Sequence, residues 1–219
     1  MANICYRCGQ TAGNTKEHVV PRCFYPLRPN AQLVTVPACR SCNEQLSPDE
    51  EYLRTVLTSS NVRNRSAYAV WQQKVMPWLE REEFDGLRTS LVANMRDVYL
   101  PSPGGFMRSG LLKLDAARMD RVAEKIVRGM YYHITGNAMP LTTTMKLYWQ
   151  PKNWPPHEIT LSWQRIDVDP DVFSCCYAMG TKASTEFSIW WMVFYRSFVY
   201  VVTVLNKASS PVAVASISP

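Results

Sequence analysis

Two Cys-x-x-Cys pairs near the N-terminus constrain this 219-residue chain more than any other feature of its sequence. The pairs are Cys5/Cys8 and Cys39/Cys42, and Gly9 directly follows the first of them. A Cys-x-x-Cys turn delivers two thiolates to one ion, and Zn²⁺ prefers four such ligands in a tetrahedron. The sequence therefore predicts a structural zinc ion bound by these four cysteines. A redox pair or a chance spacing is the alternative.

The composition is that of a chain that folds around a core. Apolar residues make up 47% of the sequence and charged residues 19%, which excludes a disordered protein. The N-terminus lacks the apolar run of a signal peptide, and no stretch reaches the roughly 20 apolar residues of a membrane span. We therefore expect a soluble, cytoplasmic protein with no membrane partner. In such a compartment paired cysteines bind metal rather than form disulfides.

The segment between the two pairs and just after them has the pattern strand, strand, helix. Residues 15–21 (TKEHVVP) and 32–36 (QLVTV) are rich in β-branched residues, and each run is expected to end at a proline. Residues 43–59 have helical composition. His18 would thus lie on the first strand, and Asn43 would lie where the helix begins.

In this order, CxxC, EHVVP, CRSCN and the following helix resemble the HNH, or ββα-metal, endonucleases, in the zinc-containing branch with four cysteine ligands. The resemblance covers about residues 1–60. It implies that His18 is the general base and that Glu17 and Asn43 bind one catalytic Mg²⁺ or Mn²⁺ ion. The residue chemistry agrees: an imidazole with a pKa of about 6.5 accepts a proton near neutral pH, and side-chain oxygens suit a hard cation. A histidine that only belongs to a nucleic-acid-binding zinc module is the alternative for His18.

Two positions depart from the usual HNH pattern. The family commonly has Asp before the catalytic histidine, where this chain has Glu17. The asparagine that braces the histidine loop is replaced by Gln32, with Asn30 two residues earlier, and the sequence does not choose between them. Farther on, Glu50 is a candidate additional metal ligand, with a solvated charge at a helix start as the alternative.

Basic side chains that could contact a polyanion fall in two groups. One lies near the exit of the predicted nuclease module, and the other shares a face of the predicted helix 115–134 through a 3-4-3 spacing. The candidate nucleic-acid-binding residues are Arg54, Arg63, Arg65, Arg118, Arg121, Lys125 and Arg128. A plain solvated surface is the alternative for both groups. Residues 1–60 hold six basic and five acidic side chains, so most of the net charge of +6 lies in residues 61–219.

We therefore expect an α+β fold with two domains. The first is a zinc-stapled ββα-metal module over residues 1–60. The second, over residues 61–219, is an α+β region with an antiparallel sheet and an amphipathic helix. Helices are predicted at about 61–85, with a break near Pro77, and at 115–134, with one or two strands and a loop between them. Antiparallel strands are predicted at about 145–205, including a run at 158–163 and a hairpin that turns at 195–197.

These features favour a metal-dependent endonuclease that hydrolyses DNA, of the kind used in restriction, phage defence or mobile elements. Its expected cofactors are structural Zn²⁺ and catalytic Mg²⁺ or Mn²⁺. A zinc module that binds nucleic acid or protein without cleaving, and a ribonuclease, are the alternatives. A homodimer and a protein partner bound through residues 61–219 are further expectations. No Gly-rich phosphate loop is present, so ATP use is not indicated.

Overall fold

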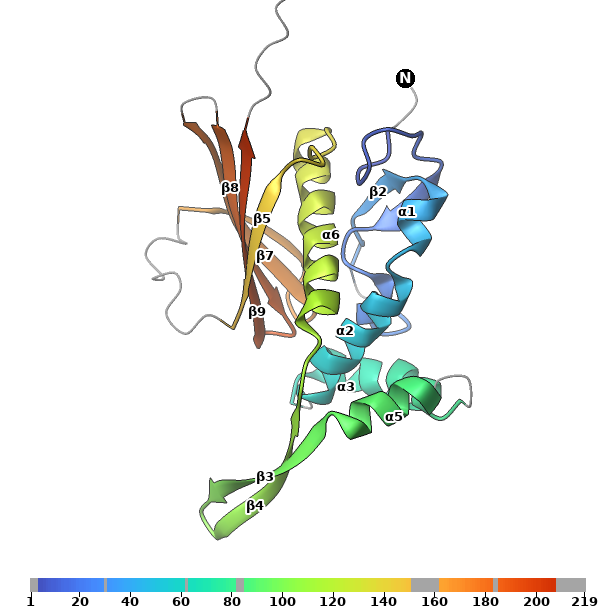
Figure 1. Ribbon diagram of the computed structural model, residues 1–219, viewed down its shortest axis with the longest axis vertical. Helices are drawn as coiled ribbons and strands as arrows, with labels where there is room; N and C mark the ends of the chain where they lie inside the picture. The colour runs from blue at the N-terminus through green and yellow to red at the C-terminus, as the bar shows by residue number, and fades with distance from the viewer. Residues whose placement is uncertain are drawn as a thin grey trace, which may run out of the picture.

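The computed structural model describes residues 4–29, 31–61, 63–81, 85–150, 162–182 and 185–207. It confirms the predicted α+β class, with antiparallel sheets and few helices. Figure 1 shows helix α6 (Ala116–Thr135) at the centre, with the N-terminal module on one side and a five-stranded sheet on the other. None of the helices in the described part of the chain combines the length and apolar character that crossing a membrane requires.

The N-terminal module has the predicted order of strand, strand and helix. Strand β1 (Thr15–His18) pairs antiparallel with β2 (Thr35–Ala38), and His18 lies opposite Thr35. The short helix α1 (Arg40–Glu44) and the longer α2 (Ser47–Ser59) follow, and a 3-10 turn, η1 (Arg22–Phe24), lies between the strands.

The prolines do not end the strands as expected. Strand β1 already ends at His18, and Val19 and Val20 beyond it are buried. Pro37 lies inside β2, paired with Lys16, because a strand at the edge of a sheet tolerates a residue without an N–H donor.

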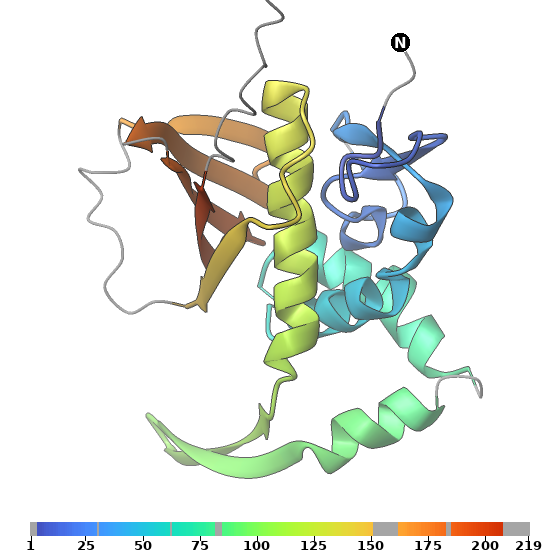
Figure 2. The same ribbon diagram turned by 45° about the horizontal axis from the view of Figure 1, so that its top comes forward.

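A broken helical segment and a hairpin lead from the module to α6. Helix α3 (Arg65–Val70) runs into a π-helical turn, η2 (Trp71–Val75), and then into α4 (Met76–Leu79). Pro77 lies in the first turn of α4, directly after the π-helical turn, so the helix type changes there while the helix itself continues to Leu79. Helix α5 (Asp85–Ala93) was not predicted, and it leads into the hairpin of β3 (Met95–Ser102) and β4 (Gly105–Leu112). Figures 1 and 2 show this hairpin extending away from the rest of the protein.

The large sheet has the strand order β5-β9-β8-β7-β6, and all neighbouring strands are antiparallel. Its strands are β5 (Thr144–Trp149), β6 (Gln164–Asp169), β7 (Phe173–Lys182), β8 (Thr185–Phe194) and β9 (Phe198–Lys207). The predicted hairpin at 195–197 is confirmed, and Tyr195 and Arg196 both have positive φ, as a tight hairpin turn requires. The predicted strand at 158–163 falls largely outside the described residues, and β6 begins just after it.

Helix α6 joins the two sides into one core. Asp115 caps its start through a side-chain bond from Arg118 N, and Gly136 ends it with φ of 73°. Its apolar residues belong to one buried cluster that also contains Val19 and Leu53 of the N-terminal module and Trp190 of the sheet. Figure 2 shows α6 between the two layers. The predicted domain boundary at residue 60 thus lies within a continuous core.

Candidate metal centre and active site

Four cysteines converge at one end of the N-terminal module. Cys5 and Cys8 come from the loop before β1, and Cys39 and Cys42 come from the start of α1; all four Sγ atoms lie within 4.8 Å of one another. A tetrahedral ion with bonds of about 2.3 Å would separate its sulfurs by about 3.8 Å, so the cluster fits one metal ion and is compatible with structural zinc. Gly9, with φ of 63°, closes the first turn by donating its N–H to Cys5 O at 2.9 Å.

Hydroxyl groups next to the cluster favour the thiolate form of Cys39 and Cys8, whereas burial raises the pKa of Cys42. Ser41 Oγ lies 3.3 Å from Cys39 Sγ, and this contact, together with hydrogen bonds from Thr11 and the backbone of Cys42, lowers the pKa of Cys39 to about 5. Burial raises the pKa of Cys8, but hydrogen bonds from Thr11 and from backbone groups outweigh that effect and lower the pKa to about 7. A metal ion binds the thiolate form, so both residues are suited to ligate one.

His18 stands at the end of β1 and is half-buried. Burial lowers its pKa, and the positive charges of Arg22 and Lys125 lower it further. The imidazole is therefore neutral near pH 7 and can accept a proton. Of the two residues expected to brace its loop, Gln32 is exposed, and Asn30 lies outside the described residues.

Asn43 lies on α1, next to the metal cluster. Its Nδ2 donates to Thr15 Oγ1 at 2.9 Å, and Thr15 Oγ1 donates in turn to Ala38 O at 2.8 Å. The amide of Asn43 therefore ties α1 to both strands of the module. Its hydrogen-bonded nitrogen faces β1, on which Glu17 lies two residues beyond Thr15.

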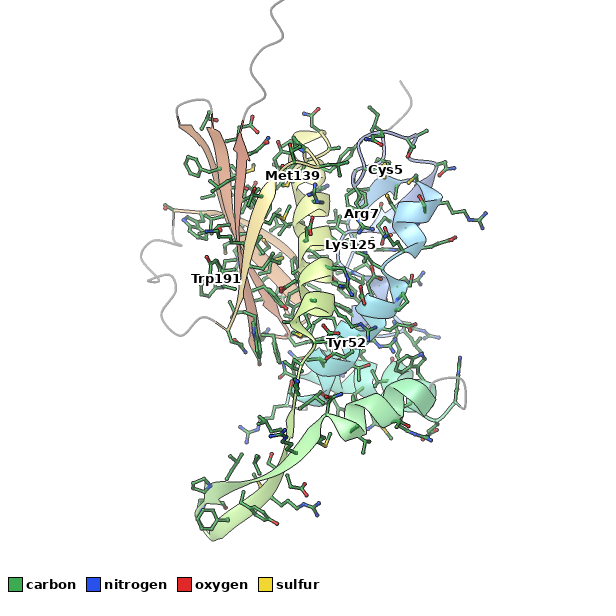
Figure 3. All side chains as sticks on the ribbon, viewed as in Figure 1. Cys5, Arg7, Tyr52, Lys125, Met139 and Trp191 are labelled. Carbon is green, nitrogen blue, oxygen red and sulfur yellow. The ribbon has the colours of Figure 1, made fainter. Side chains whose placement is uncertain are left out.

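Glu17 is bound by a cation that belongs to the chain itself. Lys125 Nζ of α6 lies 2.8 Å from Glu17 Oε1, 2.6 Å from Glu50 Oε1 and 3.1 Å from the carbonyl oxygen of His18. Glu17 is 6% exposed and Lys125 is 2% exposed. Figure 3 shows Lys125 between α6 and the N-terminal module. Burial raises the pKa of Glu17, and the Lys125 ammonium opposes this rise.

The divalent ion that the resemblance implies does not fit this arrangement. The Lys125 ammonium occupies the space beside Glu17 Oε1, and the carboxylate is closed off from solvent. A divalent ion placed there would lie against a positive charge at hydrogen-bond distance, which a buried site does not tolerate. Glu17 and Asn43 therefore do not offer a site for Mg²⁺ or Mn²⁺ in this arrangement.

Models of protein families, curated proteins and solved structures offer no match to this chain.

The four cations of α6 do not form an exposed stripe, which corrects the expectation for nucleic-acid binding. Lys125 is buried, and so is Arg128, at 5% exposure. Arg128 bonds to Glu124 at 2.9 Å and to the carbonyl oxygens of Met139 and Pro140 at 3.1 and 3.3 Å. Both side chains are therefore internal counter-ions rather than candidate phosphate contacts.

Arg118 and Arg121 are more exposed, but both hold α6 against α2. Arg118 Nε lies 2.8 Å from Asp49 Oδ1, and Arg121 Nε lies 2.7 Å from Asp49 Oδ2. Arg118 also stacks over the ring of Tyr52. Glu50 and Asp49, at the start of α2, are thus both paired with α6, so Glu50 is not a solvated charge.

The cations near the end of the module and just after it also differ in exposure. Arg54 is 5% exposed and lies over the ring of Trp78 at 5.1 Å, so it is not placed to contact a phosphate group. Arg63, just before α3, and Arg65, its first residue, are exposed and stay candidates for such contact. Cys23 is half-buried, and burial raises its pKa to about 12, as expected of an unreactive thiol.

Sequence reasoning missed the pairing of Lys125 with Glu17. A signal was present: Lys125 lies three residues after Val122 and four before Gly129, so all three share one column of the helix. Both neighbours in that column are buried, and Gly129 packs closely against Val19 of the module. A lysine in the middle of such a column has to find its counter-ion inside the protein.

Proposed function

We propose that this chain is an HNH-type endonuclease that hydrolyses phosphodiester bonds of DNA, with a structural zinc ion on Cys5, Cys8, Cys39 and Cys42. One observation carries the proposal: the four-thiol cluster braces a strand-strand-helix unit in which His18 ends the first strand. This is the arrangement that the sequence resemblance implies.

In this proposal His18 is the general base. Its neutral, half-buried imidazole takes a proton from a water molecule, and the resulting hydroxide attacks phosphorus while the bond to the 3′ oxygen breaks. The departing 3′ oxygen takes a proton from solvent, and the imidazolium returns its proton to solvent. The products, by resemblance to the family, carry 5′-phosphate and 3′-hydroxyl ends. The zinc ion has no step in this reaction; it fixes the loop before β1 to the start of α1, at the end of the β1-β2 hairpin opposite His18. The exposed Arg63 and Arg65 are the candidates for holding the DNA backbone.

A specific observation favours a second candidate, a zinc module that binds nucleic acid without cutting it. Lys125 neutralises Glu17, and a carboxylate held in this way is not available to a catalytic ion. The two candidates share the zinc cluster and the exposed cations, and they differ in whether His18 takes part in a reaction.

The deciding experiment is cleavage of supercoiled plasmid by the full-length chain in metal-depleted buffer, with and without Mg²⁺ or Mn²⁺. The wild type is compared with His18→Ala and with His133→Ala, whose residue is exposed on α6 and far along the chain from the module. We expect one zinc ion per chain in all three proteins. We expect the loss of the base to slow nicking by at least about 100-fold, while His133→Ala cuts like the wild type.

The alternatives give different results in the same assay. Equal nicking by all three proteins would exclude His18 as the base. If none cuts plasmid or a structured RNA, and all three shift DNA equally in a gel, the binding module is the correct function. Cleavage of the RNA alone would identify a ribonuclease.

A further inference from the structure

Three oxygen atoms surround Lys125 Nζ, and all belong to the N-terminal module. They are Glu17 Oε1, Glu50 Oε1 and the carbonyl oxygen of His18, at 2.8, 2.6 and 3.1 Å. An ammonium group has three N–H donors, so each is satisfied. Carboxylate and carbonyl oxygens are also the ligands that Mg²⁺, Mn²⁺ and Ca²⁺ prefer. The module thus presents a cation site of oxygen ligands, and a side chain from 108 residues along the chain fills it.

Two more oxygens in this region are buried and lack a hydrogen-bond partner. They are Glu17 Oε2 and the hydroxyl of Tyr6. Burial raises the pKa of Tyr6, and the negative charge of Glu17 raises this pKa further, so the phenol stays neutral. A buried polar atom without a partner is uncommon in a folded protein. Lys125 therefore leaves the second carboxylate oxygen of Glu17 without a partner.

The charges point the same way. Two carboxylates and one ammonium group give the site a net charge of −1. Removing the ammonium leaves −2 in a nearly closed space, which a single divalent ion would neutralise. Keeping the ammonium and adding the ion would instead force two cations together at short range.

We propose that Glu17, Glu50 and the His18 carbonyl form a divalent-cation site that Lys125 keeps closed, so that the chain's own ammonium group stands where an ion would bind. The packing of α6 fixes Lys125 in this position. Lys125 lies in the middle of α6, which is packed on both faces, and Gly129 one turn on lies against Val19, next to His18. The role of this site in catalysis rests on the proposed function, but its ability to bind an ion does not.

The test measures Mn²⁺ binding to the zinc-loaded, full-length chain by titration calorimetry and by the EPR signal of free Mn²⁺. Lys125→Met keeps the length of the side chain and removes its charge. We expect this variant to bind one Mn²⁺ ion at least about tenfold more tightly than the wild type, because an ion no longer competes with the ammonium group. Arg121→Met, which removes a more exposed cation from the same helix, is the matched control and should bind Mn²⁺ like the wild type.

Two outcomes would overturn the proposal. One such outcome is that wild type and Lys125→Met bind Mn²⁺ with equal affinity and that adding Glu17→Gln abolishes binding in both. Lys125 would then not close the site. No Mn²⁺ binding by Lys125→Met would mean that the oxygens do not form a cation site.

Folding of the variant is followed separately, since Lys125→Met leaves two carboxylates without a counter-charge. We expect Mn²⁺ to raise the melting temperature of Lys125→Met and to leave that of Glu17→Gln/Lys125→Met unchanged. A variant that is unfolded and gains no structure with Mn²⁺ contradicts the proposal. None of these readouts uses DNA, so a failure to cleave plasmid and a failure to bind Mn²⁺ are distinguishable.

Discussion

Replacing Gly129 with alanine should destabilise the protein, although alanine is the better helix former. A Cβ atom at this position of α6 would lie 2.9 Å from Val19 Cγ1 and 3.1 Å from Val19 Cγ2. Carbon atoms in good contact are about 3.5–4.0 Å apart. Val19 is fully buried and its side chain is short and branched, so it cannot turn away from the new methyl group. The helix or the module must shift instead.

The expected size follows from two opposing terms. Alanine gains about 1 kcal/mol over glycine in a helix interior, and overpacking a core costs about 1–3 kcal/mol. The net loss in the free energy of unfolding is thus about 1 kcal/mol for Gly129→Ala. Val19→Ala alone, which removes two buried methyl groups, should cost about 2 kcal/mol. In the double variant the Cβ atom at position 129 no longer clashes with the valine side chain. It fills part of the space that the removed methyl groups of Val19 leave.

The assay is urea unfolding followed by circular dichroism on the zinc-loaded wild type, both single variants and the double variant. Helix propensity contributes equally to both arms of this cycle, so it cancels in the coupling energy. We expect the double variant to be about 1–2 kcal/mol more stable than the sum of the single changes. Additivity within about 0.5 kcal/mol would refute the close approach of α6 to the module at Gly129.

Two further perturbations test other contacts of the module. Burial raises the pKa of Asp49, but hydrogen bonds from Arg121 and Arg118 outweigh burial and hold the pKa below its ordinary value. The ionised carboxylate therefore stabilises the fold at pH values above its unfolded-state pKa. This stabilisation is lost as the pH falls through the folded-state pKa. Asp49→Asn should therefore lower the free energy of unfolding by about 1–3 kcal/mol at pH 7. The difference from wild type should shrink when unfolding is measured at successively lower pH. A constant difference from pH 7 to pH 3 would exclude the ion pairs as its cause. Exhaustive chelation of zinc should unfold residues 1–60 and lower the melting temperature of the whole chain, because the module shares its core with α6. An unchanged circular dichroism spectrum and melting temperature in the zinc-free protein would contradict the four-thiolate assignment.

The parts of the structure that sequence predicted well are those with local signals. The spacing of the cysteine pairs indicated their cluster, and the 3.6-residue period marked α6 to within about one residue at each end. The turn at Tyr195–Arg196 lay between two aromatic and β-branched runs that could only pair as a hairpin. Helix α5 was missed because residues 85–93 carry no clear apolar period.

The candidate site was predicted only in part, because its energetics depend on contacts between distant segments. Glu17 and His18 were identified from their motif, but the motif does not contain Lys125. The cations of α6 looked like one exposed stripe because a single helix shows its period and not which of its faces are covered. Since α6 is covered on two sides, Lys125 and Arg128 became internal partners, whereas Arg118 and Arg121 stayed near the surface.

Because Lys125 belongs to α6, the N-terminal module depends on a helix outside residues 1–60. A fragment cut after α2 would keep all four cysteines and His18, yet Glu17 and Glu50 would lose their counter-charge and Val19 would lose its cover. Such a cassette could not be grafted onto another protein, or inherited by recombination, with its site intact. Residues 1–60 and α6 therefore have to be transferred, and to change in sequence, as a single unit.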